Sequence, residues 1–302
     1  MSFILTADWH LRSQRPRCRL DDNWLETQKN ALAQIAAYAG QYEADGVFAV
    51  GDIFHSTNET TNEIIGLVQE FALMLCDLDT SLYLLAGNHD LPQHNLENIH
   101  RSAFSILLNS KNIFHIRDSD YFAEYGYKHS ASDFGVCDEN AQVIFKHVLC
   151  FPENEKIPPG STIVRPSELY ALYGNAKYIF TGDYHRQFVY VKGKKKLFNP
   201  GCLLRQAADM IDYEPSVFLI DADKNGEFTH TICPIHDNER LVTDLYLEKE
   251  EERNDRIDAF IERIKDNEKI SFDFVENVHN SIQKNKMSEN IKKRILELLE
   301  GQ

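Results

Sequence analysis

Three short apolar runs punctuate the first third of the chain. They cover residues 3–7, 47–50 and 82–86, and polar residues follow each run at once. Apolar runs of this length with abrupt ends are typical of buried β-strands. We therefore expect three strands, each leading into a polar loop.

Amphipathic stretches of helical length lie between these runs. The first follows Asp22 or Asn23, either of which can cap a helix. The second opens with Thr60 and Glu63, a capping-box pair, and continues to about Leu75. Strand, helix and strand in this order predict β-α-β units with polar residues at the strand ends.

The middle of the chain is richer in strands, after one further helix expected near 97–109. Apolar runs at 143–149 and 178–181 precede two expected hairpins, one turning at 192–196 and the other at Asp223-Lys224-Asn225-Gly226. These elements indicate a second sheet packed on the first. We predict an α/β fold over residues 1–240, with two mixed β-sheets packed as a sandwich with flanking helices.

Charged helical sequence begins at about Glu248. Its apolar residues form two stripes at helical spacing: Ile257, Phe260, Ile261 and Ile264, then Ile291, Ile295, Leu298 and Leu299. We expect residues 241–302 to form a C-terminal helical extension. A reduced cap, a dock for a partner and a helical layer on the chain's own core all fit this pattern.

Composition and charge narrow the class of protein. The 302 residues are 43% hydrophobic, which suffices for a packed core. No apolar run approaches the roughly 18 residues of a membrane span, and the start lacks the features of a signal peptide. The six cysteines form no C-x-x-C pair, so we expect reduced thiols and a cytoplasmic location. The net charge of −15 argues against a broad basic surface for nucleic acid and leaves room for divalent cations.

Metal-binding side chains stand at the ends of the expected strands. They are Asp8 and His10, Asp52, Asn88 and His89, His147, and Asp183 and His185. Ligands bind α/β sheets at this edge. Oxygen and imidazole donors without cysteine suit Mn²⁺, Fe²⁺ or Zn²⁺ in place of a thiolate zinc site. So many donors are too many for one ion but fit two ions about 3.5–4 Å apart that share one carboxylate and activate a water; Asp52 is the natural bridge.

Each of these residues taken alone has an ordinary explanation. A strand-end Asp or His is more often a cap, a turn residue or a satisfied polar group. His147 carries the weakest local signal, because a histidine within a strand is often only packed. The metal-site interpretation depends on the co-occurrence of all these residues after apolar runs.

The order of the motifs resembles a known superfamily. D-x-H, G-D, G-N-H-D, a lone histidine and G-x-x-H together resemble the calcineurin-like metallophosphoesterases. Asp8-Trp9-His10-Leu11-Arg12, Gly51-Asp52-Ile53-Phe54-His55 and Asn199-Pro200-Gly201-Cys202 are similar to the nuclease subunit of the SbcC–SbcD and related double-strand-break repair complexes, bacterial or phage. The resemblance covers about residues 1–235.

The resemblance implies roles for individual residues. One metal ion would lie among Asp8, His10, Asp52 and His185, and the other among Asp52, Asn88, His147 and Asp183. His89 would stabilise the phosphoryl transition state or protonate the leaving oxygen, with His55 as a further histidine at the site and Asp90 orienting its neighbours. Asp183 stands where the superfamily usually has histidine. The extra carboxylate favours Mn²⁺, with Mg²⁺ or Fe²⁺ as alternatives, over zinc.

The sequence predicts the type of reaction more closely than it predicts the substrate. Arg12, beside the first ligands, and Arg205, after the Asn199-Pro200-Gly201 turn, are candidate contacts to substrate phosphates. The first hypothesis is a DNA exo/endonuclease subunit working with an SbcC-like ATPase, as a homodimer and without membrane contact. The second is a phosphatase or small-nucleotide phosphodiesterase. The third is a non-catalytic scaffold with a degenerate metal site, which only Asp183 suggests.

Overall fold

The computed structural model describes residues 1–58, 60–118, 121–123, 127–132, 137–157, 162–223, 226–237, 242–245 and 293. By its contacts the chain divides into two units, residues 1–244 and 245–302. The two apolar helical stripes expected after Glu248 lie outside the described residues. The following description concerns the first unit.

Six strands form the first sheet, in the order β11-β10-β1-β2-β3-β4. The strands β1 (Ser2–Thr6), β2 (Gly46–Val50), β3 (Ser81–Leu85) and β4 (Ile113–His115) are mutually parallel. The hairpin of β10 (Ser216–Ala222) and β11 (Phe228–Pro234) adds to β1 in antiparallel register. This hairpin therefore widens the first sheet and is not part of the second.

Five strands form the second sheet, in the order β5-β6-β7-β9-β8. Here β5 (His129–Ser132), β6 (Val143–His147), β7 (Tyr178–Gly182) and β9 (Lys195–Asn199) are parallel, and β8 (Phe188–Lys192) closes the edge in antiparallel register. Both sheets are thus mixed, as predicted. The parallel ends of β6 and β7 put two of the expected ligand segments at one edge.

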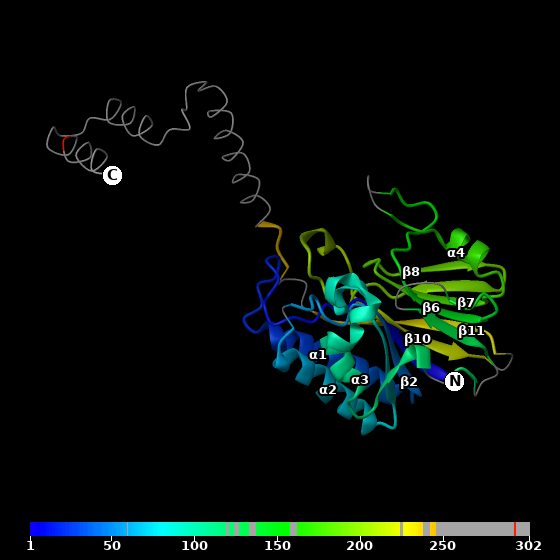
Figure 1. The fold of residues 1–302 in the computed structure, drawn as a ribbon, viewed down its shortest axis with the longest axis horizontal. Coiled ribbons are helices and arrows are strands. Elements are labelled where there is room, and N and C mark those ends of the chain that lie inside the picture. The colour runs from blue at the N-terminus through cyan, green and yellow to red at the C-terminus, as the bar shows by residue number, and fades with distance from the viewer. Residues whose placement is uncertain are drawn as a thin grey trace. The chain divides into compact units, whose positions relative to one another are not determined.

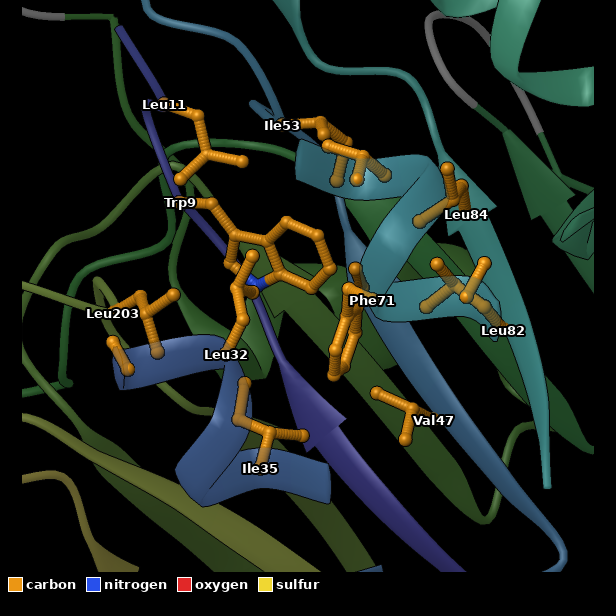
Figure 2. Packing of buried hydrophobic residues seen from close by; sticks show 14 of the residues in the cluster. Trp9, Leu11, Leu32, Ile35, Val47, Ile53, Phe71, Leu82, Leu84 and Leu203 are labelled. Atoms are coloured by element: carbon orange, nitrogen blue, oxygen red, sulfur yellow. The ribbon is translucent and has the colours of Figure 1, made fainter. Parts of the chain in front are cut away.

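Helices cover the outer faces of both sheets. Three of them, α1 (Trp24–Gln41), α2 (Asn62–Cys76) and α3 (Ala103–Leu108), gather on the first sheet, whereas α4 (Pro166–Leu172) packs on the second (Figure 1). Trp9 is fully buried in the first of these layers, with its ring 5.7 Å from that of Phe71 (Figure 2). The predicted α/β sandwich with flanking helices is the observed fold.

Alternation along each strand separates the two cores. In β1, Ile4 faces the helices, whereas Phe3 and Leu5 face the second sheet. The layer between the sheets is rich in aromatic rings, with Phe3 5.7 Å from Phe180 across it. Each fully buried phenylalanine stabilises the fold by about 1.5–3 kcal/mol, so this layer fixes the two sheets against each other.

The predicted start of α1 agrees with the structure, whereas that of α2 differs by one residue. The side chain of Asn23 caps α1 by accepting from the Glu26 amide at 3.2 Å. The cap of α2 is Thr61 and not Thr60, whose hydroxyl donates to the Ser56 carbonyl at 2.7 Å.

The single helix expected near 97–109 is divided in the structure. A 3₁₀ helix spans Leu96–Arg101, and Ser102 then caps α3 through its side chain. Short 3₁₀ helices also occur at Asn88–Asp90, Pro92–His94, Ile116–Asp118 and Ala208–Met210.

Candidate metal centre

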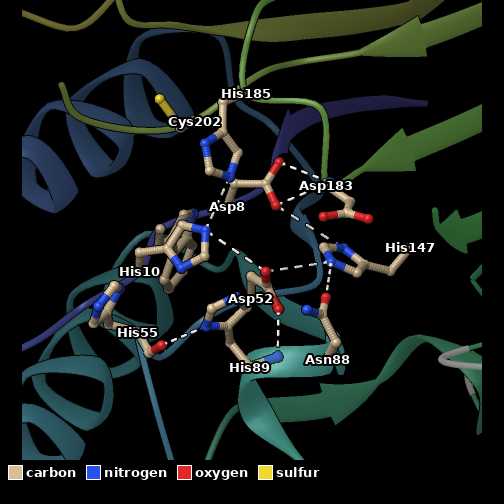
Figure 3. Close-up of polar contacts among 12 residues, drawn as sticks. Asp8, His10, Asp52, His55, Asn88, His89, His147, Asp183, His185 and Cys202 are labelled. Carbon is tan, nitrogen blue, oxygen red and sulfur yellow. Dashed lines mark hydrogen bonds and ion pairs between the residues drawn. The ribbon is translucent and has the colours of Figure 1, made fainter. Parts of the chain in front are cut away.

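The carboxyl ends of strands from both sheets meet at one edge of the sandwich (Figure 3). His147, the last residue of β6, has its Nδ1 2.8 Å from the carbonyl oxygen of Val50, the last residue of β2. A carbonyl only accepts, so Nδ1 carries a proton, and in the neutral ring Nε2 presents its lone pair to the site. Metal-binding histidines are commonly held in this way by a backbone carbonyl.

One group of donor atoms comprises Asp8, His10 and His185, whose donor atoms lie within 4.8 Å of one another. The Nε2 atoms of the two histidines are 3.1 Å apart. Burial lowers the pKa of His10 and of His185. Burial therefore favours the neutral imidazole, which is the form that binds a cation.

A second group comprises Asp8, Asp52 and His147, again within 4.8 Å. Asn88 joins it, because its Oδ1 lies 3.2 Å from Nε2 of His147. Asp8 is thus common to both groups of donor atoms.

Asp52, a member of the second group, also approaches the first. Its Oδ2 is 3.6 Å from Nε2 of His10 and 3.4 Å from Nε2 of His147. This oxygen is buried and accepts no hydrogen bond from the described residues. Buried carboxylate oxygens are normally paired, and a cation would supply the missing partner. The donor set therefore fits two divalent ions that share a carboxylate.

The charges in the site also favour cations. Burial raises the pKa of Asp8, and the neighbouring carboxylates Asp52 and Asp183 raise it further against the opposing effect of His147. Burial opposes protonation of His147, yet Asp52 and Asp8 outweigh it and hold the pKa of His147 well above its ordinary value. Several buried carboxylates thus stabilise positive charge at this point, as a metal-binding site must.

Asp183 contacts the other candidate ligands through its backbone amide. Its amide donates to both carboxylate oxygens of Asp8 at 3.0 Å. Its own carboxyl group is outside the three close groups of donor atoms found among the described residues. Burial raises its pKa, and the positive charge of His147 opposes this. Direct ligation by Asp183 remains a prediction.

Ligand segments adopt unusual backbone conformations. Asp8, His10, Asp52 and Asp183 have φ angles of 50°, 46°, 51° and 80°. Left-handed conformations cost a non-glycine residue of order 1–3 kcal/mol and persist where surrounding contacts enforce them. One such contact joins the His10 amide to the Asp52 carbonyl at 2.9 Å. Strain concentrated at these positions supports a functional site.

Asp90 lies behind the site and ties two loops together. It accepts hydrogen bonds from the amides of Ile53, Phe54 and Gly87 at 3.1, 2.8 and 2.8 Å. Burial, with the charge of Asp52, raises the pKa of Asp90 to about 7. Asp90 thereby fixes the loop after β2 against the loop after β3, which carries His89.

His89 and His55 stand beside the donor groups. Nδ1 of His89 donates to the His55 carbonyl at 2.5 Å, so its Nε2 is available to a substrate. Nε2 of His55 accepts from the Arg12 guanidinium at 2.6 Å. His10, His55 and His89 also have donor atoms within 4.8 Å of one another. The edge of the sandwich where the candidate metal ligands lie is called the metal-site edge. The structure therefore brings Arg12 and both predicted catalytic histidines to this edge.

Arg205 does not have the role expected from its sequence position. Its residue surface is 5% exposed, and its guanidinium contacts the Asp237 carboxylate and the Tyr213 carbonyl. A guanidinium so enclosed is used within the fold and is not presented to a substrate. The substrate-contact prediction for Arg205 is wrong for this reason.

Two residues at the site were not expected from the sequence. The Gln206 amide donates to the carbonyls of Trp9 and His10 at 2.9 and 3.3 Å, which supports the first ligand segment. His94 has its Nδ1 2.8 Å from the carbonyl oxygen of Asn88. The sequence distance between Gln206 and Trp9 hides the first contact. The closeness of His94 to the G-N-H-D motif could have indicated the second.

Among the described residues, no helix has both the length and the apolar character needed to cross a membrane.

Two solved structures with low sequence identity resemble this chain. An archaeal phosphodiesterase is 15% identical, with a TM-score of 0.40, and the match covers 77% of this chain and 99% of that one. A dimetal phosphatase from Danio rerio is 8% identical, with a TM-score of 0.44, covering 78% and 99%.

Sequence comparisons give one curated relative and one family. Exonuclease subunit 1 of Enterobacteria phage T4 is 24% identical over 149 residues, which make up 49% of this chain and 42% of that protein. The chain thus spans less than half the length of this relative. The family model for calcineurin-like phosphoesterases matches residues 1–187. This match covers more than half of the 302 residues and includes every candidate metal ligand, so the chain belongs to the calcineurin-like phosphoesterase family.

Proposed function

We propose that this protein is a metal-dependent DNA exo/endonuclease that hydrolyses phosphodiester bonds with two divalent ions. One observation carries the metal-dependent reaction: the buried Oδ2 of Asp52, which accepts no hydrogen bond from the described residues, lies between imidazoles of the two donor groups. Support for DNA as the substrate comes from the nuclease-like motifs and from the likeness to the phage exonuclease subunit.

Bound divalent cations would polarise the phosphodiester and activate a water for attack at phosphorus. Asp8, Asp52, His10 and His185 would hold one cation, and Asp52, Asn88, His147 and Asp183 the other. The Val50 carbonyl keeps Nε2 of His147 directed at the site. Asp52 also accepts from the His89 amide at 2.9 Å, which couples the shared ligand to the catalytic loop.

His89 would transfer the proton that the leaving oxygen needs. The His55 carbonyl holds Nδ1–H, which leaves Nε2 as the position from which a proton would be donated. Arg12 donates to Nε2 of His55 and so fixes its ring, and its guanidinium is the proposed contact to a substrate phosphate. In this arrangement His55 is a positioning residue for His89.

Mn²⁺ is the proposed ion, with Mg²⁺ or Fe²⁺ as alternatives. Carboxylate and amide oxygens make up more than half of the proposed set, and such oxygens favour the harder divalent ions. Asp183 adds a further carboxylate where the family usually has histidine. Zinc, which prefers nitrogen and sulfur donors, is the less suitable ion.

The proposed partners are DNA, an SbcC-like ATPase and a second copy of this chain, in the cytoplasm. The word "subunit" in the name of the phage relative supports assembly with other chains. The segment expected to dock the ATPase, within residues 241–302, lies almost wholly outside the described residues. The dock is tested by deleting the chain from Glu250 onward and measuring ATPase binding in a pull-down. If the shortened protein still binds the ATPase, the dock is excluded.

A phosphatase or small-nucleotide phosphodiesterase is the second candidate, favoured by the net charge of −15. A Mn²⁺ assay on linear duplex DNA, single-stranded DNA, bis-p-nitrophenyl phosphate and a phosphomonoester separates the two. We expect cleavage of DNA and of the small diester. Turnover of monoesters alone would exclude the nuclease, and turnover of none of the four would favour a scaffold with a degenerate site.

A further inference from the structure

A polar cavity of about 810 Å³ opens beside His55 and His89. Its lining also includes residues after the G-N-H-D motif, among them His94, Asn98 and Arg101, which are called the cavity wall below. A volume of this size is typical of a ligand pocket. Because the cavity shares two imidazoles with the metal-site edge, a substrate held at the metals could extend into it.

The charge of this cavity differs from that of the whole chain. The protein has 47 acidic residues against 32 basic ones. Yet the described residues that line the cavity include an arginine and three histidines and no aspartate or glutamate. The arginine gives this wall a positive charge that attracts an anion, whereas the net charge of the protein repels one.

The local backbone explains how the cavity wall excludes a carboxylate. Asn98 and Arg101 lie three residues apart in the 3₁₀ helix Leu96–Arg101, and residues at this spacing share a face. Glu97 lies one position away, so it falls on another face and is not among the lining residues. The α-helix expected from the sequence would not have aligned Asn98 and Arg101 so closely.

The polar atoms on this face are available to a ligand. Arg101 is exposed and Asn98 half-buried. Within the described part of the chain, no hydrogen bond or ion pair engages either side chain. His94 is held by Asn88 through Nδ1 and adopts a left-handed φ of 51°. His94 thus connects the cavity wall to Asn88, a predicted metal ligand. Asn98 and Arg101 contribute donors to the same wall that no described residue uses.

We propose that Asn98 and Arg101 form a subsite for a second phosphate of a polynucleotide whose scissile phosphodiester is held at the metals. This inference rests on the proposed nuclease function and specifies its substrate as a chain with at least two phosphates. Guanidinium and amide donors suit phosphate oxygens through charge-assisted hydrogen bonds. A diester with a single phosphate has no group that reaches the subsite.

The test compares Arg101→Gln with the wild type on two substrates in Mn²⁺. For a single-stranded oligonucleotide we expect KM to rise about tenfold and the dependence of binding on log[salt] to lose about 0.7 of its slope, the value for one phosphate contact on a single strand. For bis-p-nitrophenyl phosphate, kcat and KM should stay within about twofold. Arg117→Gln is the matched control, because Arg117 is outside the cavity and paired with Asp118 at 3.4 Å.

The outcomes separate the subsite from the proposed function. An unchanged KM and salt slope for the oligonucleotide in Arg101→Gln would overturn the subsite and leave the nuclease standing. An equal rise of KM on both substrates would also overturn it, because it would indicate a general disturbance of the site. A wild-type protein that cleaves the small diester and no oligonucleotide would overturn the nuclease itself.

Discussion

His147 and Val50 join the two sheets of the sandwich at the metal-site edge through the 2.8 Å contact between Nδ1 and the carbonyl oxygen. The contact fixes the tautomer of the histidine and the separation of β2 from β6. It depends on Gly51, since a Cβ at that position would lie 2.0 Å from Nδ1 of His147. Gly51 also has a φ of +88°, which favours glycine.

Gly51→Ala is therefore expected to displace His147 and to destabilise the protein. The clash and the left-handed backbone together place the cost at about 2–4 kcal/mol. Urea unfolding measures it, and equilibrium dialysis with Mn²⁺ should show loss of one of two bound ions.

Gly66→Ala is the matched control for this substitution. Gly66 lies within α2, and an added Cβ would meet no atom within 4 Å. Alanine in an open helical position is expected to stabilise by about 0.5–1 kcal/mol. A stabilised Gly66→Ala beside an unaffected Gly51→Ala would contradict the steric explanation.

Asp52→Asn tests the shared ligand. The change nearly preserves shape but removes the carboxylate charge that lies against the His10 and His147 imidazoles and holds the pKa of His147 high. Replacing a residue that only hydrogen-bonds a metal ligand already weakens metal affinity by about 10–100-fold. For a ligand itself we expect a loss above about 100-fold, measured by Mn²⁺ titration followed by electron paramagnetic resonance. Mn²⁺ affinity equal to that of the wild type would remove Asp52 from the centre.

The metal-site edge was predictable because its signals are local. Each ligand segment directly follows an apolar run, and the geometry of a parallel sheet then gathers the segments whatever the details of the fold. Asp8, Asp52 and His147 could thus be assigned to one site before their distances were known. His147 needed the contact with Val50, 97 positions away, to become more than a packed histidine.

Other features depend on partners distant in sequence. Arg205 follows a turn near the site, which suggested a substrate contact, but Asp237 lies 32 positions later and withdraws it into the fold. The β10–β11 hairpin has the same local pattern whichever sheet it joins, and its pairing with β1 decides the outcome. The subsite at Arg101 required a 3₁₀ helix where the periodicity favoured an α-helix.

Arg205→Met checks the corrected role of this arginine. Removing one partner of a buried ion pair leaves Asp237 with Arg19, whose Nη1 lies 2.9 Å away, so we expect a cost near the low end of about 3–5 kcal/mol. KM for DNA should not change under conditions where the variant is folded. A raised KM with unchanged stability would restore the substrate contact.

Acid stability depends on Asp21. Burial alone would raise its pKa, but hydrogen bonds from Arg19 and Thr27 outweigh burial and lower the pKa below 3.8. A depressed folded-state pKa contributes stability above the unfolded pKa, and this contribution is lost as pH falls through the folded value. Asp21→Asn should therefore be less stable than the wild type at pH 7, with the difference shrinking below about pH 4 in urea unfolding. A difference that is constant with pH would exclude this linkage.

His89→Ala distinguishes proton transfer from charge stabilisation at the leaving oxygen. Loss of a general acid costs about 10²–10⁴-fold in rate when the leaving group is an alkoxide, as in DNA. The p-nitrophenolate of the small diester is a stable anion that needs no proton, so its release should slow much less. His236→Ala, at an exposed position that lines neither described wall of the site, should affect neither substrate. Equal losses on DNA and on the small diester, with Mn²⁺ content unchanged, would exclude the acid role, because only an interaction with the phosphoryl group itself is common to both reactions.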